Sequence, residues 1–93
     1  MPLPSYVTFS DTLFVQEVDG ELVLLDTETD YYFGLDAVGK AFWDTIEANG
    51  GDIEQSIVAL LEMFDVDEAI LRRDMAAFLR QLEEHRLVRT ESA

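Results

Sequence analysis

The residues of this chain with the most obvious chemical potential are carboxylates, because aspartate and glutamate make up 20 of its 93 residues. Two acidic clusters, at residues 26–30 and 65–68, invite comparison with the start of an EF-hand calcium loop. Such a loop also needs a glycine at its sixth position, where the two clusters have Tyr31 and Ile70. Both clusters are therefore better interpreted as turn and helix-capping residues than as metal ligands.

Other groups that commonly catalyse reactions are scarce. The chain has no cysteine, which excludes disulfides, thiolate metal sites and a cysteine nucleophile. Its single histidine, His85, falls near the end of a predicted helix, where an imidazolium interacts favourably with the helix dipole. No G-x-S-x-G turn, phosphate-binding loop or dinucleotide-binding glycine motif is present. We therefore expect a protein that is not an enzyme and that uses no cofactor or metal.

The charge of the chain excludes further classes of function. Six lysines and arginines against 20 acids give a formal net charge of −14, which repels nucleic-acid phosphates and anionic membrane surfaces. All five arginines lie within residues 72–93. No segment approaches the ~18 uncharged apolar residues of a membrane span, and the N-terminus lacks the pattern of a signal peptide. We expect a cytoplasmic protein in which residues 1–93 form a single domain.

The first third of the chain has the pattern of an antiparallel sheet. Apolar and β-branched segments at 12–18 and 21–26 flank Asp19-Gly20, a dipeptide that favours a two-residue hairpin turn. After a second turn signal, residues 31–35 predict a third strand of the same meander. A short additional strand is predicted at residues 6–9.

From Asp36 onward the apolar residues recur with the 3.6-residue period of helices. Helices are predicted over about 37–48, 53–64 and 68–85, each preceded by an aspartate that can cap it. A short tail at 87–89 follows. The sequence thus predicts an α+β fold of winged helix-turn-helix-like type, with a three-stranded antiparallel sheet followed by three helices.

The segment 31–35 is the strongest candidate for a binding site, because the last strand of a meander has one unpaired edge. Two interpretations remain open. In one, the aromatic residues cover the sheet and the last helix shields the edge; in the other, a partner peptide adds to this edge as a further strand. The candidate residues on the strand are Tyr31, Tyr32, Phe33, Gly34 and Leu35.

The last predicted helix would form the other wall of such a site. At about 100° per residue, its apolar core face is flanked by a mixed polar and apolar surface that suits a partly exposed groove. The candidate peptide-binding residues on this helix are Ile70, Asp74, Ala77, Phe78 and Gln81.

The order and spacing of one set of residues within 6–89 are informative: Val23-Leu24-Leu25-Asp26, Tyr31-Tyr32, Leu35-Asp36, Gly39, Trp43, Gly50-Gly51, Asp65-Val66-Asp67, Asp74-Met75, Phe78-Leu79, Leu82 and Leu87-Val88. They resemble those of the PqqD-like RiPP recognition elements, in particular the stand-alone leader-binding proteins of lasso peptide biosynthesis. The resemblance departs from the usual family pattern at 36–39, at Met75 and at His85-Arg86.

This resemblance implies a non-catalytic protein that binds the leader region of a ribosomally made precursor peptide. The leader would add as a strand beside residues 31–35 and against the last helix. The family further implies delivery of the precursor to a separate leader peptidase, a cysteine protease, and by extension to a macrolactam-forming cyclase. The alternative from another class is a winged-helix interaction module associated with transcription.

The net charge leads to a direct prediction about nucleic acid. Duplex DNA should show no salt-sensitive binding at physiological ionic strength, because the acidic chain offers few cations to replace the DNA counterions. A gel-shift assay at micromolar protein tests this. A shifted band that weakens steeply with added salt would contradict the prediction and favour the winged-helix alternative.

Overall fold

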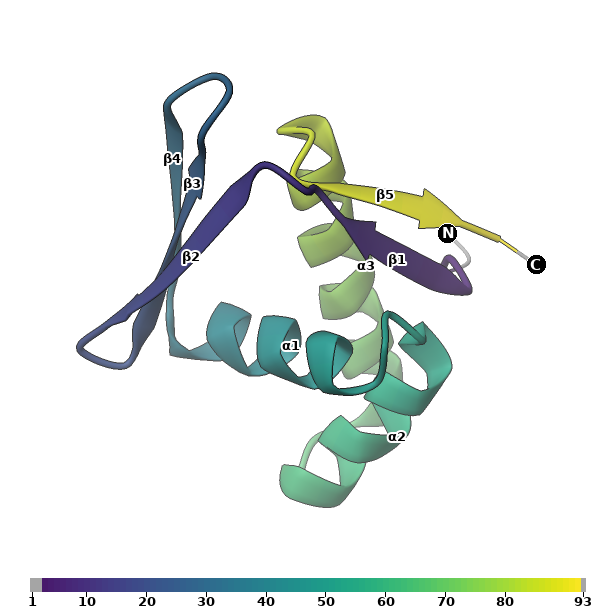
Figure 1. Cartoon of the computed structure of the whole chain (residues 1–93). Coiled ribbons are helices and arrows are strands. Elements are labelled where there is room, and N and C mark those ends of the chain that lie inside the picture. Colours follow the sequence, from purple (N-terminus) through teal and green to yellow (C-terminus); the bar gives the residue numbers. More distant parts are fainter. Residues whose placement is uncertain (1–2, 93) are drawn as a thin grey trace.

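A computed structural model describes residues 3–92 of the chain, which contain five strands and three helices (Figure 1). Three of the strands form an antiparallel sheet in the order β2-β3-β4, and the other two pair separately as β1-β5. The elements are β1 (Tyr6–Phe9), β2 (Leu13–Val18), β3 (Glu21–Asp26), β4 (Tyr31–Leu35), α1 (Ala37–Ala48), α2 (Ile53–Met63), α3 (Glu68–Glu84) and β5 (Val88–Glu91). The predicted α+β fold, with a three-stranded antiparallel sheet followed by three helices, is confirmed.

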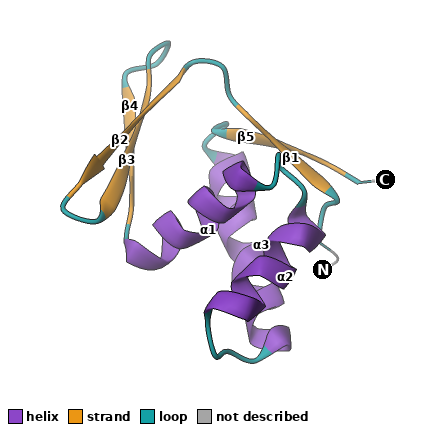
Figure 2. Cartoon of the chain, turned by 60° about the horizontal axis from the view of Figure 1, so that its bottom comes forward, coloured by secondary structure: helices purple, strands orange, loops and turns teal. Residues whose placement is uncertain are grey.

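The C-terminal segment differs from the sequence-based prediction. Residues 87–89 were expected to be a tail, but Val88 begins β5, which pairs antiparallel with β1. Figures 1 and 2 show this two-stranded ribbon apart from the β2-β3-β4 sheet. The two strands are four residues each and lie at opposite ends of the chain, so no local pattern indicates their pairing. Burial of Val7 and Val88 in the shared core stabilises the ribbon.

The turns and helix ends follow the sequence closely. Asp19 and Gly20 have φ values of 53° and 82°, as a tight hairpin turn with two left-handed residues requires. The side chains of Asp36, Asp52 and Asp67 each accept a backbone N–H three residues later, at 2.9, 3.0 and 3.1 Å. Each aspartate thereby satisfies one unpaired donor in the first turn of its helix.

The two acidic clusters therefore have structural roles. In the first, Asp26 is buried and accepts hydrogen bonds from the backbone N–H of Glu28 and the hydroxyl of Thr12, which lower its pKa. These bonds hold the turn that leads into β4. In the second, Asp67 caps α3.

The hydrophobic core lies between the three helices, the β1-β5 ribbon and one face of the sheet. Trp43 and Ile46 of α1 are fully or almost fully buried, as are the apolar residues of α2 and α3 that face them. The sheet contributes Leu22 and Leu24 from β3 and Leu35 from β4. Only one side of the sheet faces this core, so the opposite side is left for solvent or a partner.

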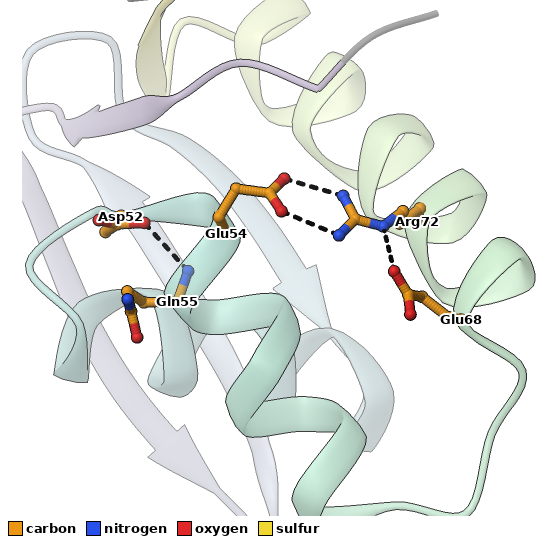
Figure 3. Close-up of polar contacts among 5 residues, drawn as sticks. All are labelled: Asp52, Glu54, Gln55, Glu68 and Arg72. Carbon is orange, nitrogen blue, oxygen red and sulfur yellow. Dashed lines mark hydrogen bonds and ion pairs between the residues drawn. The ribbon is translucent and has the colours of Figure 1, made fainter.

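A polar clamp joins α3 to the start of α2, as Figure 3 shows. The guanidinium of Arg72 donates two hydrogen bonds to the carboxylate of Glu54, both 2.8 Å long. Its Nε donates to Glu68 at 2.9 Å. The bond to Arg72 lowers the pKa of Glu54, and the bonds to Glu54 and Glu68 raise the pKa of Arg72. The clamp fixes the position of α3 relative to α2 with the two-pronged geometry that only arginine provides.

Replacing Arg72 with Lys should lower the melting temperature by about 2–4 °C, because the clamp is partly exposed and contributes about 0.5 kcal/mol. Lysine keeps the charge but loses the bidentate bond. The pKa of Glu54 is lowered on folding, so the clamp stabilises the protein above the ordinary value of 4.5 and loses this effect as the pH falls through the folded value. Thermal melts at neutral pH and at about pH 3 should therefore show a difference that shrinks in acid.

Arg73→Lys is the matched control, because the Arg73 side chain is 75% exposed and its contact to Asp74 is 3.8 Å long. It should leave the melting temperature unchanged. Equal melting temperatures for Arg72→Lys and the unmodified protein would contradict a stabilising clamp.

Candidate functional site

The free edge of β4 is the first feature of the candidate site. β4 pairs with β3 on one side, and no strand within residues 3–92 pairs with its other side. Next to the β2-β3 ladder, the Thr27 N–H donates a hydrogen bond to the Thr12 carbonyl. Counting from this pair along the register, every second pair of β2 and β3 residues is hydrogen-bonded, and the last such pair is Val18 with Glu21. The other residues of β3, which do not hydrogen-bond β2, form their backbone hydrogen bonds with the odd-numbered residues of β4. The backbone groups of Tyr32 and Gly34 consequently point to the open edge.

The side chains of β4 alternate between two faces of the sheet. Tyr31, Phe33 and Leu35 share the inner face, where Leu35 is buried and Phe33 packs against the core. Tyr31 stacks on His85, which follows α3, with ring centroids 5.0 Å apart. Tyr32 has an exposed fraction of 67% and lies on the outer face.

A groove of about 460 Å³ separates β4 from α3. Its three sides come from three elements: the second half of β4, the N-terminal half of α1 as the floor, and one flank of α3 as the far wall. The lining residues are Phe33, Gly34, Leu35, Asp36, Val38, Gly39, Phe42, Asp74, Ala77, Phe78 and Gln81.

The floor of the groove depends on Gly39. A Cβ atom at this position would lie 3.2 Å from the Cβ of Leu35 and 3.5 Å from the ring of Phe78. Below it, the rings of Phe42 and Phe78 meet edge to face with centroids 5.4 Å apart. A Cβ at residue 39 would therefore require Leu35, at the end of β4, to move by a few tenths of an ångström.

Of the ten residues proposed from the sequence, seven line this groove and three lie elsewhere. Tyr31 lies beyond one end, against His85. Tyr32 reaches the site only through its backbone. Ile70 lines an adjoining apolar pocket of about 300 Å³, which also contains Phe64 and Val66.

Sequence reasoning missed the contribution of α1, namely Asp36, Val38, Gly39 and Phe42. In the structure Val38 is 63% exposed beside the groove, whereas Phe42 is buried beneath it. The available signal was the single residue between β4 and α1, which forces the first turn of α1 to lie against the end of the strand.

The chemistry of the groove suits an extended peptide. Its walls are mainly apolar and aromatic, and the only charged residues among those lining it, Asp36 and Asp74, are acidic. Within residues 3–92, no three or more histidine, aspartate or glutamate side chains are grouped so as to hold a metal. In the same range, no helix has the length and apolar character needed to cross a membrane.

Comparison with known proteins assigns the family. The family model for coenzyme PQQ synthesis protein D (PqqD) matches residues 21–88. The chain belongs to the PqqD family. As a PqqD-like RiPP recognition element, it has β3, β4 and all three helices, and therefore the whole groove, inside the matched region.

Two solved structures resemble this PqqD-family chain over nearly its full length. One is TbiB1 in complex with the TbiA(beta) leader peptide, with 35% identity, a TM-score of 0.82, and coverage of 92% of this chain and 99% of that chain. The other is lasso peptide synthetase B1 complexed with the leader peptide, with 20% identity, a TM-score of 0.79, and coverage of 90% and 98%. The second likeness concerns the fold alone. No curated protein sequence matches the chain significantly.

Proposed function

We propose that this chain is a non-catalytic protein that binds the leader region of a ribosomally synthesised precursor peptide in lasso peptide biosynthesis. The leader adds as a strand beside β4 and against α3, and the chain presents it to a separate leader peptidase and, by extension, to a macrolactam cyclase. The observation that carries the proposal is the open edge of β4 facing a peptide-sized groove. The complex of TbiB1, which is 35% identical to this chain, with a leader peptide supports it.

The geometry of strand addition explains how affinity arises. A strand bound beside β4 would lie about 4.8 Å away and pair with the outward N–H and C=O groups of Tyr32 and Gly34. Its alternate side chains would then enter the groove between β4 and α3, where Ala77 leaves space and Phe78 offers an aromatic surface.

The groove also favours a particular peptide chemistry. Inward-facing residues of the leader are apolar, because they pack on Phe33, Phe42 and Phe78. A basic residue near the Leu35 end of β4 would be attracted by Asp36 and Asp74 and by the net charge of −14. The apolar pocket at Ile70 extends the site beyond this end, and His85 with Tyr31 bounds the opposite end.

The proposal includes all ten residues named from the sequence, with different roles. Tyr32 and Gly34 contribute their outward backbone groups, and Tyr31, Phe33 and Leu35 lie on the inner face of the strand. The far wall is formed by Asp74, Ala77, Phe78 and Gln81 of α3, and Ile70 lines the adjoining pocket. In this proposal, residues 1–93 form a single leader-binding domain. We also propose that its fold is of winged helix-turn-helix-like type. No feature of the described residues favours the alternative role in transcription.

Replacing Tyr32 with Pro tests strand addition directly, because proline removes one outward backbone donor. Binding of a fluorescent leader peptide should weaken about tenfold or more. Tyr32→Ala is the matched control: it removes the same side chain but keeps the N–H, so it should bind nearly as well as the unmodified chain. Circular dichroism must show that both variants are folded.

The proline test is specific to its position. Phe33→Pro would instead remove a donor directed at β3, so it should destabilise the sheet itself. If folded Tyr32→Pro binds the leader as tightly as Tyr32→Ala, strand addition at β4 is wrong.

Replacing Ala77 with Trp tests the α3 wall. The indole would occupy the groove, and leader binding should weaken about tenfold or more through steric exclusion, while the loss of helix propensity stays below ~1 kcal/mol. Ala76→Trp is the control, because Ala76 lies about 100° further round α3, beside a separate space of about 180 Å³. It should affect binding less.

The same peptide titration, with thermal melts, measures both variants. If Ala76→Trp abolishes binding and Ala77→Trp has no effect, the leader contacts the opposite flank of α3.

A further inference from the structure

The groove between β4 and α3 is closed at the end where β4 begins. The part of β4 that lines the groove is residues 33–35, so the groove does not extend past Tyr31 and Tyr32. β4 and α3 run in opposite directions, which brings the C-terminal end of α3 level with the first residues of β4 (Figure 1). A side chain at this end of α3 can therefore reach across to the strand.

His85 is the residue that does so. It follows α3, and its backbone N–H donates to the carbonyl of Gln81 at 3.3 Å, so it continues the path of the helix. At about 100° per residue, His85 lies about 20° from Asp74 and about 40° from Gln81 around the helix axis. It is therefore the next member of the α3 flank that forms the far wall of the groove.

The imidazole of His85 connects this wall to β4. Its ring stacks on that of Tyr31 with centroids 5.0 Å apart and an angle of 19° between the planes, and it packs at a tilt on Phe33 at 5.1 Å. Tyr31 and Phe33 are successive residues of the inner face of β4, and their own rings are 6.4 Å apart. We call these three residues the aromatic bridge, because they join the two walls.

A strand added to β4 would meet this bridge with one of its inward side chains. Residues that lie opposite each other on neighbouring strands point to the same face of a sheet. Leader residues beside Phe33 and Leu35 therefore point into the open groove. The leader residue beside Tyr31 points to the space that the His85 ring occupies, since that ring comes from the far wall.

The contacts of the bridge determine which leader residue fits at this position. A glycine, alanine or serine can lie beside the His85 ring, whereas a large side chain requires the ring to move away. His85 is exposed and free to move in that direction, but it would then lose its contacts with both Tyr31 and Phe33. Losing two aromatic contacts corresponds to about tenfold or more in affinity.

We infer that His85 is a specificity-determining residue of the leader site, whose ring requires a small residue at the leader position beside Tyr31. The inference rests on the proposed function, since it concerns the strand added to β4. It adds a selection by sequence that the open edge lacks, because the backbone groups of Tyr32 and Gly34 pair in the same way with almost any leader. The position of the small residue then sets the register of the bound strand.

The test is a tryptophan scan of the leader. The probe is the fluorescent leader peptide of the precursor encoded beside this chain, with tryptophan introduced at one position of its strand-forming segment at a time. Against the unmodified chain, tryptophan at one position near an end of that segment should weaken binding about tenfold or more. His85→Ala should bind this same peptide within about threefold of the unsubstituted leader, because no ring has to be displaced.

Two further variants show that the ring is responsible. His85→Phe keeps a ring but no ionisable group, so it should discriminate against the tryptophan peptide as the unmodified chain does. Glu84→Ala is the matched control for the alanine substitution, because Glu84 is exposed and lies about 100° from His85 around α3. It should recover no peptide, and circular dichroism and thermal melts verify that all three variants are folded.

The outcomes separate this inference from the proposed function. If the unmodified chain binds no leader, the proposed function is wrong and the inference with it. If the leader binds but tryptophan is tolerated throughout, or His85→Ala recovers no peptide or recovers outward-facing positions equally, His85 does not select the leader residue while leader binding stands. If His85→Ala weakens binding of the unsubstituted leader about tenfold, the ring is a contact surface for the leader and not a barrier.

Discussion

The candidate site depends on the hydrogen-bonding pattern of an antiparallel sheet. A strand can direct only every second residue toward a given neighbour, so β3 satisfies the backbone of alternate residues of β4 and leaves those of Tyr32 and Gly34 facing outward. An open edge of this kind is costly if buried and hazardous if exposed. The chain ends its meander at β4 and turns directly into α1 through Asp36, which leaves that edge available beside a groove.

The helices are arranged so that the groove stays open. The cap at Asp36 starts α1 at the end of β4, and Gly39 lets this helix approach without pushing the strand away. The buried face of α3 packs on the core through Met75 and Leu79, which leaves its neighbouring flank to form the far wall. The clamp at Arg72 ties α3 to α2 through a side chain that does not line the groove.

The net charge of −14 restricts the kinds of molecule that can bind to this protein. An acidic body discourages nucleic acid, anionic membranes and self-association alike, and it favours neutral or basic peptides and proteins. The groove lies on the inner side of β4, and Tyr32 lies on its outer side. The two sides carry different side chains because neighbouring residues of a strand point in opposite directions.

The sequence by itself determined the local structure: the Asp19-Gly20 turn, the three aspartate caps, the helix boundaries to within about a residue, and the flank of α3 on which Asp74, Ala77 and Gln81 lie. These features arise from short-range periodicity and capping chemistry, which a single segment encodes. Only the tertiary structure decided the pairing of β1 with β5, the floor that α1 contributes, and the assignment of Ile70 and Tyr32 to places outside the groove. Those outcomes depend on contacts between segments far apart in the chain or on the angle at which elements pack, and no local pattern records either.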